Sequence, residues 1–217
     1  MQATVRSRFR GFNEPFEGVV PFMYQDILGF ITVGVGNLID PLSEAERLPF
    51  RFKSKPGIDN PGQLASRPEI IAEWNRIKGD ASLAKKGHKA CEPITDLELD
   101  DAAINDLISE RLDDNEAILK KQAAFQDFDS WPADAQLGLL SMAWAMGANA
   151  LHAFRRFSAG CRRLDFKVAA RECLIKEDGN PGVIPRNRAN RTLFLNAAAV
   201  VASAGDRAVL HFPAVLV

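Results

Sequence analysis

The apolar and polar positions divide the chain into a first part with strand-like patterning and a second part with helical periodicity. Residues 22–35 are mostly aromatic or aliphatic, with several β-branched side chains, and are interrupted by Gly29 and Gly34. This pattern is typical of a hairpin or a small meander. A short helix over 6–16 precedes it and is expected to end or bend near Pro15, because proline removes a backbone donor. The first part therefore predicts a helix followed by a small antiparallel sheet.

The next segment is dominated by residues that break regular structure. Residues 40–68 are rich in Pro, Gly and Ser, which predicts mainly loop. Within it, 43–48 has the pattern of a single turn of helix. A short helix over 69–78 is expected to follow.

Helical periodicity dominates from Thr95 onward. Thr95-Asp96-Leu97-Glu98 has the composition of a capping box, so we expect a helix to begin there and to run to Lys120 on its apolar repeat. Asp129-Ser130-Trp131-Pro132 contains an N-cap candidate and a proline for the first turn of a helix. We therefore expect the next helix over 133–146, and we expect Gly147 to end it. Three further helices are expected near 150–156, 165–175 and 186–204.

Together these elements predict an α+β fold that is mainly α. We expect one domain over 1–217, in three parts: an N-terminal lobe over 1–93 with a loop-rich insertion at about 41–93, a connecting helix over 94–120, and a helical lobe over 121–217.

Composition agrees with a soluble globular chain. The 217 residues are 47% hydrophobic and 25% charged, with a formal net charge of −1, which argues against a nucleic-acid binder. The charge is uneven, however: residues 92–129 hold twelve acids against three Lys or Arg, and residues 150–191 hold ten Lys or Arg against four acids. A basic surface in the second half would suit an anionic polymer. Solvated helix faces are the simpler interpretation.

Cysteine usage and hydropathy bear on the compartment. Cys91, Cys161 and Cys173 have no CxxC spacing, so we expect reduced thiols. The first residues contain no apolar run of signal-peptide length, and the apolar run over 137–151 is shorter than the ~20 residues that span a bilayer. We therefore expect synthesis in the cytoplasm without a signal peptide, delivery by another route, and no membrane partner.

Three residues in or just before the strand-like segment point to chemistry. Glu17 and Asp26 are two carboxylates nine residues apart, and the Thr32 hydroxyl follows six residues later. An inverting glycoside hydrolase needs a carboxylic acid for the leaving oxygen and, at roughly 6.5–9.5 Å, a second carboxylate that activates water. Thr32 on the facing strand is placed to hold that water, and the apolar neighbours of Glu17 are expected to keep it protonated. Without the surrounding pattern, a helix end, a turn and a strand would explain the three residues equally.

The surrounding pattern resembles that of the phage-type lysozymes of glycoside hydrolase family 24. The family reads Glu-Gly and then Tyr-x-Asp-x-x-Gly-x-x-Thr-x-Gly-x-Gly. This chain matches without a gap, with Glu17-Gly18 followed by Tyr24, Asp26, Gly29, Thr32, Gly34 and Gly36. Two later segments, 140–147 and 185–191, resemble the family's buried helix under the cleft and its C-terminal Asn-Arg-Ala-x-Arg stretch. The similarity covers about two thirds of the chain.

The resemblance implies a lysozyme-like fold and a role for each matching residue. Glu17 corresponds to the general acid, Asp26 to the carboxylate that positions water, and Thr32 to the hydroxyl beside that water. Arg188 corresponds to the arginine that pairs with the catalytic glutamate. Leu38 and Trp144 correspond to residues that touch sugar, although a tryptophan in the core fits the sequence as well. No metal or cofactor is implied.

Departures from the family concern the surroundings of these residues. Asn37 replaces a histidine that forms an ion pair with the long helix. Residues 41–93 are longer than the phage counterpart by about 25 residues. This insertion is interpreted as a cover for one end of the cleft, a site for the peptide stem, a partner site or a tolerated surface loop.

The implied activity is that of a muramidase, which hydrolyses the β-1,4 bond between N-acetylmuramic acid and N-acetylglucosamine with inversion. Its partners would be peptidoglycan glycan strands. The alternatives are a lytic transglycosylase, which needs the acid but not the water-holding pair, and a silent wall-binding module.

Two longer stretches of sequence indicate a biological setting. Residues 15–24 and 36–41 resemble lysozyme-type toxins that bacteria deliver by contact-dependent secretion, such as type VI secretion. The site of action would then be the periplasm of the target cell, and the partners would include an immunity protein or a component of the secretion machinery. A phage endolysin of the same chemistry is the alternative.

Overall fold

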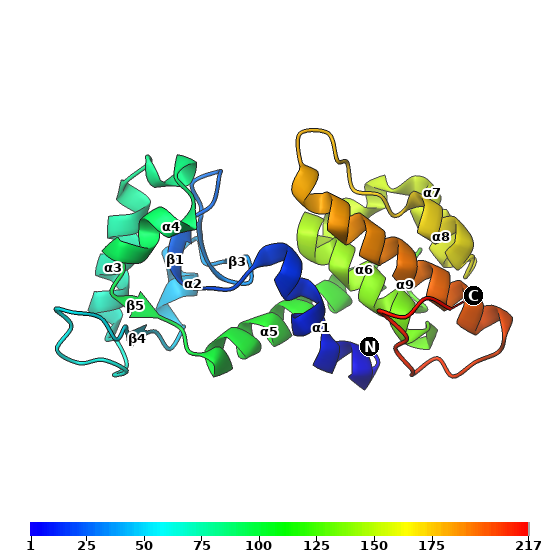
Figure 1. Ribbon diagram of the computed structural model, residues 1–217, viewed down its shortest axis with the longest axis horizontal. Coiled ribbons are helices and arrows are strands. Elements are labelled where there is room, and N and C mark those ends of the chain that lie inside the picture. Colours follow the sequence, from blue (N-terminus) through cyan, green and yellow to red (C-terminus); the bar gives the residue numbers. More distant parts are fainter. Residues whose placement is uncertain (217) are drawn as a thin grey trace. The chain divides into compact units, whose positions relative to one another are not determined.

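The computed structural model describes residues 1–216 and is mainly helical, with 57% helix and 8% strand (Figure 1). This confirms the α+β, mainly α class. The chain forms two compact units. The sheet unit comprises Glu17–Ser109, and the helical unit comprises Met1–Phe16 and the residues from Glu110 onward. The first residues thus belong with the C-terminal helices, whereas the sequence placed them in the N-terminal lobe.

The predicted meander is present in the sheet unit. Its strands are β1 (Val20–Gln25), β2 (Ile31–Gly34) and β3 (Asn37–Leu38), joined antiparallel in the order β1-β2-β3. Alternate residues point to opposite faces of a sheet. One face is buried and carries Met23, Gln25, Ile31 and Val33. Helix α3 (Arg67–Gly79) packs against β1 and β2, and the Gln25 amide donates to the Ile77 carbonyl at 2.6 Å.

A second, two-stranded sheet replaces the predicted capping box. Strand β4 (Arg51–Phe52) pairs with β5 (Leu97–Glu98), and helix α5 runs over Asp101–Lys120. The prediction of a helix start at residues 94–95 was therefore wrong, while its end at Lys120 was right. The helix is capped instead by Asp100, whose carboxylate accepts the Ala103 N–H at 2.9 Å.

Tertiary contacts explain why the local signature failed. The Thr95 hydroxyl donates to the Cys91 carbonyl at 3.0 Å and accepts a hydrogen bond from the Lys53 ammonium at 2.5 Å. It is therefore not available to a helix N-terminus. The next two residues donate their N–H groups to the Glu73 carboxylate of α3, Asp96 at 2.6 Å and Leu97 at 3.2 Å, and Leu97 and Glu98 pair with β4. These contacts outweigh the local preference of a capping box.

The insertion is more ordered than its composition predicted. It contains α2 (Leu42–Glu46), β4, α3 and α4 (His88–Cys91), with 3₁₀ turns η1 (Leu83–Lys85) and η2 (Glu92–Ile94). Helices α2 and α3 lie near their predicted positions. The Glu69 carboxylate accepts the Ser66 N–H at 2.6 Å at the start of α3, so a reciprocal cap does occur here.

The helical unit begins with α1 (Ala3–Glu17), which is longer than predicted, contains Pro15 and ends at the first residue of the sheet unit. Helix α6 (Ala133–Met146) has the predicted bounds, with Gly147 at its end and Pro132 at the N-cap instead of in the first turn. The predicted helix over 150–156 is instead a 3₁₀ segment, η4, followed by α7. The remaining elements are η3 (Phe128–Ser130), η4 (Ala148–Ala153), α7 (Arg155–Arg162), α8 (Phe166–Glu172), η5 (Pro181–Val183) and α9 (Ile184–Ala202).

The core of this unit forms where α6 and α9 pack side by side (Figure 1). A Cβ at Gly138 would lie 3.0 Å from the Phe194 ring, so glycine permits this close approach. Helix α6 is buried along most of its length, as predicted for a core helix. None of the helices in residues 1–216 is both long and apolar enough to cross a bilayer.

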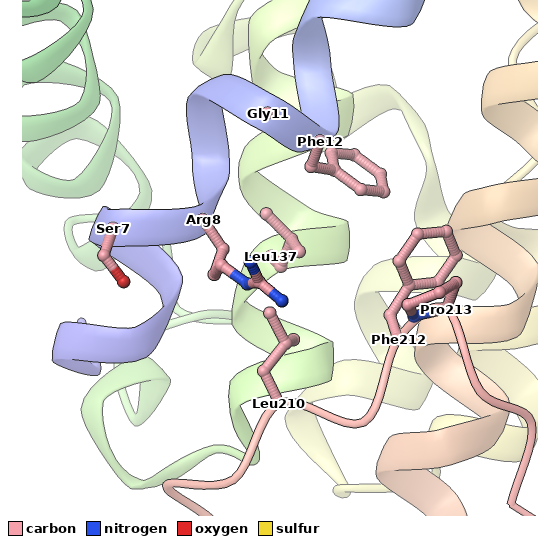
Figure 2. A pocket seen from close by; sticks show the side chains of 8 residues that line it. All are labelled: Ser7, Arg8, Gly11, Phe12, Leu137, Leu210, Phe212 and Pro213. Carbon is pink, nitrogen blue, oxygen red and sulfur yellow. The ribbon is translucent and has the colours of Figure 1, made fainter.

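A buried carboxylate holds residues 211 and 212 against the rest of the helical unit. Asp134 accepts the backbone N–H groups of His211 at 2.9 Å and Phe212 at 3.0 Å, and the Asn196 amide at 3.0 Å. Figure 2 shows the pocket of about 290 Å³ beside this segment, with Phe212 on one side and Phe12 and Leu137 on the other. None of the predicted catalytic residues lines it.

The three cysteines are free thiols, as predicted, and all are buried. Burial raises the pKa of Cys173 to about 12 and the pKa of Cys161 well above its usual value. Because the thiolate is the reactive form, we expect iodoacetamide at pH 8 to label the folded protein about 100-fold more slowly than the protein in guanidinium chloride. Mass spectrometry after timed quenching measures this ratio. Rapid labelling of Cys161 or Cys173 without denaturant would contradict the packing described here.

Candidate active site

Glu17 is the last residue of α1 and its side chain is exposed. The position at a helix end is as predicted. The apolar enclosure is not, since Phe16 turns into the helical unit, where its ring contacts Phe12 and Arg186.

The Glu17 carboxylate lies against the turn between β2 and β3. A Cβ built on Gly36 would be 3.4 Å from Glu17 Oε2, and Gly36 has a φ of +72°, where side chains are strained. Glycine at position 36 therefore permits both the positive φ of the turn and the close approach of the Glu17 carboxylate. This connects the second glycine of the Gly-x-Gly motif to the candidate acid.

We expect Gly36→Ala to lower both stability and activity. A left-handed alanine costs roughly 1–2 kcal/mol, and its methyl group would also lie in contact with the Glu17 carboxylate, 3.4 Å from Oε2. Gly57→Ala is the matched control, because Gly57 has a φ of +85° with no atom within 4 Å of the built Cβ. Thermal unfolding should show a similar loss for both variants, whereas the peptidoglycan cleavage expected from the sequence should fall only for Gly36→Ala. Equal activity of the two variants would show that the contact with Glu17 is unimportant.

Asp26 follows β1 directly and organises the turn that leads to β2. Its Oδ1 accepts the backbone N–H groups of Leu28 at 2.8 Å and Phe30 at 2.9 Å. Such a side-chain-to-backbone turn fixes the orientation of the carboxylate. Oδ2 has no hydrogen-bond partner in the described part of the chain, so this oxygen is available to a water molecule.

The strand register places the candidate residues on one face of the sheet. Thr32 pairs with Tyr24 on one side and with Leu38 on the other, and the Asp26 N–H donates to the Phe30 carbonyl at 2.9 Å. Directly paired residues of antiparallel strands share a face. Tyr24, Asp26, Thr32 and Leu38 therefore lie on the face opposite the one that packs on α3. We call it the polar face.

Exposure differs between the residues of the polar face. The Thr32 side chain is 5% exposed, and its hydroxyl makes no hydrogen bond to any other residue of the described chain. Leu38 is 54% exposed, as a residue that touches substrate would be. The arrangement offers one fixed carboxylate, one hydroxyl and an apolar edge beside them.

A charged pair that sequence reasoning missed supports the turn after β1. Lys78 of α3 donates to the Gly29 carbonyl at 2.9 Å and to Asp40 Oδ2 at 2.5 Å. Asp40 in turn accepts the Ile31 N–H at 3.2 Å. Asp40 and Lys78 are thus positioning residues for the turn that carries Asp26. Their wide separation in the sequence left no local signal for the pairing.

Trp144 is a core residue of the helical unit. It is 3% exposed, and its ring contacts Phe9 at 5.0 Å between centroids and the Arg111 guanidinium at 4.2 Å. Both contacts occupy the ring, so stacking on a sugar would require displacing them. Of the two roles left open by the sequence, the core tryptophan is the one that fits.

The arginine that contacts the end of α1 is Arg186, whereas the prediction named Arg188. Arg188 is exposed. Arg186 is 2% exposed, lies over the Phe16 ring at 4.8 Å, and donates to Asn13 Oδ1 at 2.8 Å and to the Ser141 carbonyl at 3.1 Å. The buried guanidinium therefore contacts the residue directly before Glu17, a place that the sequence assigned to Arg188.

No group of three or more His, Cys, Asp or Glu side chains within residues 1–216 has an arrangement that could hold a metal ion. Comparison with known proteins adds no identification, since no family model and no curated protein matches this chain.

Proposed function

We propose that this chain is a peptidoglycan muramidase with a lysozyme-like fold, which hydrolyses the β-1,4 bond between N-acetylmuramic acid and N-acetylglucosamine with inversion. The main support is the polar face, on which Asp26 and Thr32 lie together while Glu17 lies against the Gly36 turn of the same sheet. The ungapped resemblance of residues 17–36 to the phage-type lysozymes gives independent support.

The proposed reaction assigns one step to each side chain. Protonated Glu17 donates its proton to the glycosidic oxygen as the bond from that oxygen to the anomeric carbon breaks. A water molecule held by Asp26 Oδ2 and the Thr32 hydroxyl attacks the anomeric carbon from the opposite side and gives its proton to Asp26. The products are a reducing N-acetylmuramic acid end and a free hydroxyl on N-acetylglucosamine. The proton then returns from Asp26 to Glu17 through solvent.

Purified protein incubated with peptidoglycan sacculi tests this proposal. We expect loss of turbidity, release of reducing ends, and α-anomers at early times in the proton NMR spectrum, because inversion converts a β bond into an α product. Anhydro-muramic ends in the mass spectrum would identify a lytic transglycosylase instead. Sacculus binding without any cleavage would identify a wall-binding module.

A further inference from the structure

A pocket of about 560 Å³ lies in the sheet unit, between the start of β1 and the end of the insertion. Residues 19–22 form one wall, and the others are supplied by residues 53–55 together with His88, Glu92, Pro93 and Glu98. Its volume falls within the roughly 300–1,000 Å³ that is usual for small-molecule sites. The predicted catalytic residues do not line it, so it is separate from the polar face.

A buried ammonium lines this pocket without a counter-ion. Lys53 is 8% exposed, and its ammonium lies 4.1 Å from the centroid of the Phe22 ring. It donates to the Thr95 hydroxyl at 2.5 Å and to the Glu92 carbonyl at 3.2 Å, which leaves one of its three N–H groups for a ligand. No carboxylate of the described chain lies within ion-pair distance of it, and burial lowers its pKa although Glu73, Glu98 and Glu92 act in the opposite direction from farther away. A buried charge of this kind favours an anionic ligand.

Charges of both signs surround the pocket. Glu92 and Glu98 also line it and form no ion pair within residues 1–216, and His88 is exposed at its rim. Lys55, in contrast, is already paired with Asp96 at 2.7 Å. The groups that remain for a ligand are thus one cation, one histidine and two carboxylates. They match a ligand that carries both carboxylates and an amine.

The pocket adjoins the candidate site within the same unit. Val19, two residues after Glu17, forms part of its wall. The ring of Tyr24, on the polar face, contacts the His88 ring at 6.0 Å between centroids. A polymer lying across the polar face would therefore bring its substituents to the mouth of this pocket.

We propose that this pocket binds the peptide stem of peptidoglycan, a short peptide that bears free carboxylates and a side-chain amine. Lys53 and His88 receive a stem carboxylate, and Glu92 and Glu98 receive the amine. The inference rests on the proposed function for its choice of substrate. It also gives the insertion a specific role, since residues 53, 88 and 92 all belong to it.

Binding of the free stem tetrapeptide, measured by titration calorimetry on the full chain, tests the inference without requiring catalysis. We expect wild type to bind, and Lys53→Met and His88→Ala to bind about tenfold more weakly, because each loses a charge-assisted contact. His88 is exposed, so His88→Ala should fold even if Lys53→Met does not. Lys89→Ala is the control: Lys89 is the exposed neighbour of His88 outside the pocket, and its loss should leave binding unchanged.

A second measurement separates this inference from the proposed function. Wild type should cleave intact sacculi faster than glycan strands stripped of stems by an amidase. His88→Ala should lose most of that preference, and Lys89→Ala should keep it. Absence of tetrapeptide binding, or equal binding by wild type and both variants, would overturn the stem site even if glycan is cleaved. Absence of cleavage of either substrate would overturn the muramidase alone.

Discussion

Glu17→Gln is expected to lower the rate of reducing-end release from peptidoglycan by about 10³-fold, because a glutamine cannot protonate the leaving oxygen. The folded state should be retained. Glu17 is an exposed side chain at the end of α1, and substitutions at such positions usually change the free energy of unfolding by less than about 0.5 kcal/mol. Circular dichroism and thermal unfolding measure the fold, and the sacculus assay measures the reaction.

Glu14→Gln is the matched control for this experiment. Glu14 lies one turn earlier on the same helix, is partly exposed, and pairs with Arg10 at 3.4 Å. An exposed pair of this kind contributes at most a few tenths of a kcal/mol, so the control should retain wild-type activity and nearly all of its stability. Activity of Glu17→Gln within tenfold of wild type would remove Glu17 from the reaction and the muramidase assignment with it.

The elements that could be predicted are those whose signals are local. Helix α6 matched its predicted bounds because its apolar run is bounded by Pro132 and Gly147, which interrupt regular structure through their own backbone preferences. The three-stranded sheet was predictable for the same reason, since Gly29 and Gly36 have positive φ at its turns. Where the backbone preferences of single residues determine an element, its position can be predicted from the sequence alone.

The false capping box at Thr95 shows where local reasoning ends. A serine or threonine followed three residues later by glutamate occurs at both Ser66 and Thr95, but only Ser66 begins a helix. The difference is made by Lys53 and by strand β4, about 40 residues away in the chain. No window around Thr95 contains that information.

The candidate site divides in the same way. The shared face of Asp26 and Thr32 could be predicted because both residues belong to one hairpin with a local turn. Arg186 was missed because the motif alignment chose Arg188. The packing of α9 makes the difference visible: buried positions recur at Arg186, Asn190, Leu193 and Ala197, a helical stripe that includes residue 186 and excludes 188. The first two of these are polar, so the apolar pattern of the sequence did not mark them as buried.

The two arginines of α9 give the second large expected effect. Arg186→Ala should lower the free energy of unfolding by about 3 kcal/mol, because it removes a buried guanidinium and leaves Asn13 and the Ser141 carbonyl without their donor. Arg188→Ala should change it by less than about 0.5 kcal/mol, since Arg188 is exposed. The two substitutions lie two positions apart on α9. Urea denaturation of both variants measures the difference in their free energies of unfolding directly.

Activity should follow the same order. Arg186 supports the Phe16 ring, and Phe16 precedes the candidate acid. Loss of that support should misplace Glu17 and slow wall lysis about 10- to 100-fold at a temperature where the variant is still folded. Arg186→Lys keeps the charge but lacks the planar guanidinium that stacks and donates in a fork, so an intermediate rate is expected. A large loss of lysis in Arg188→Ala, with Arg186→Lys unaffected, would instead show that Arg188 supports Glu17, as the resemblance implies, and that Arg186 does not.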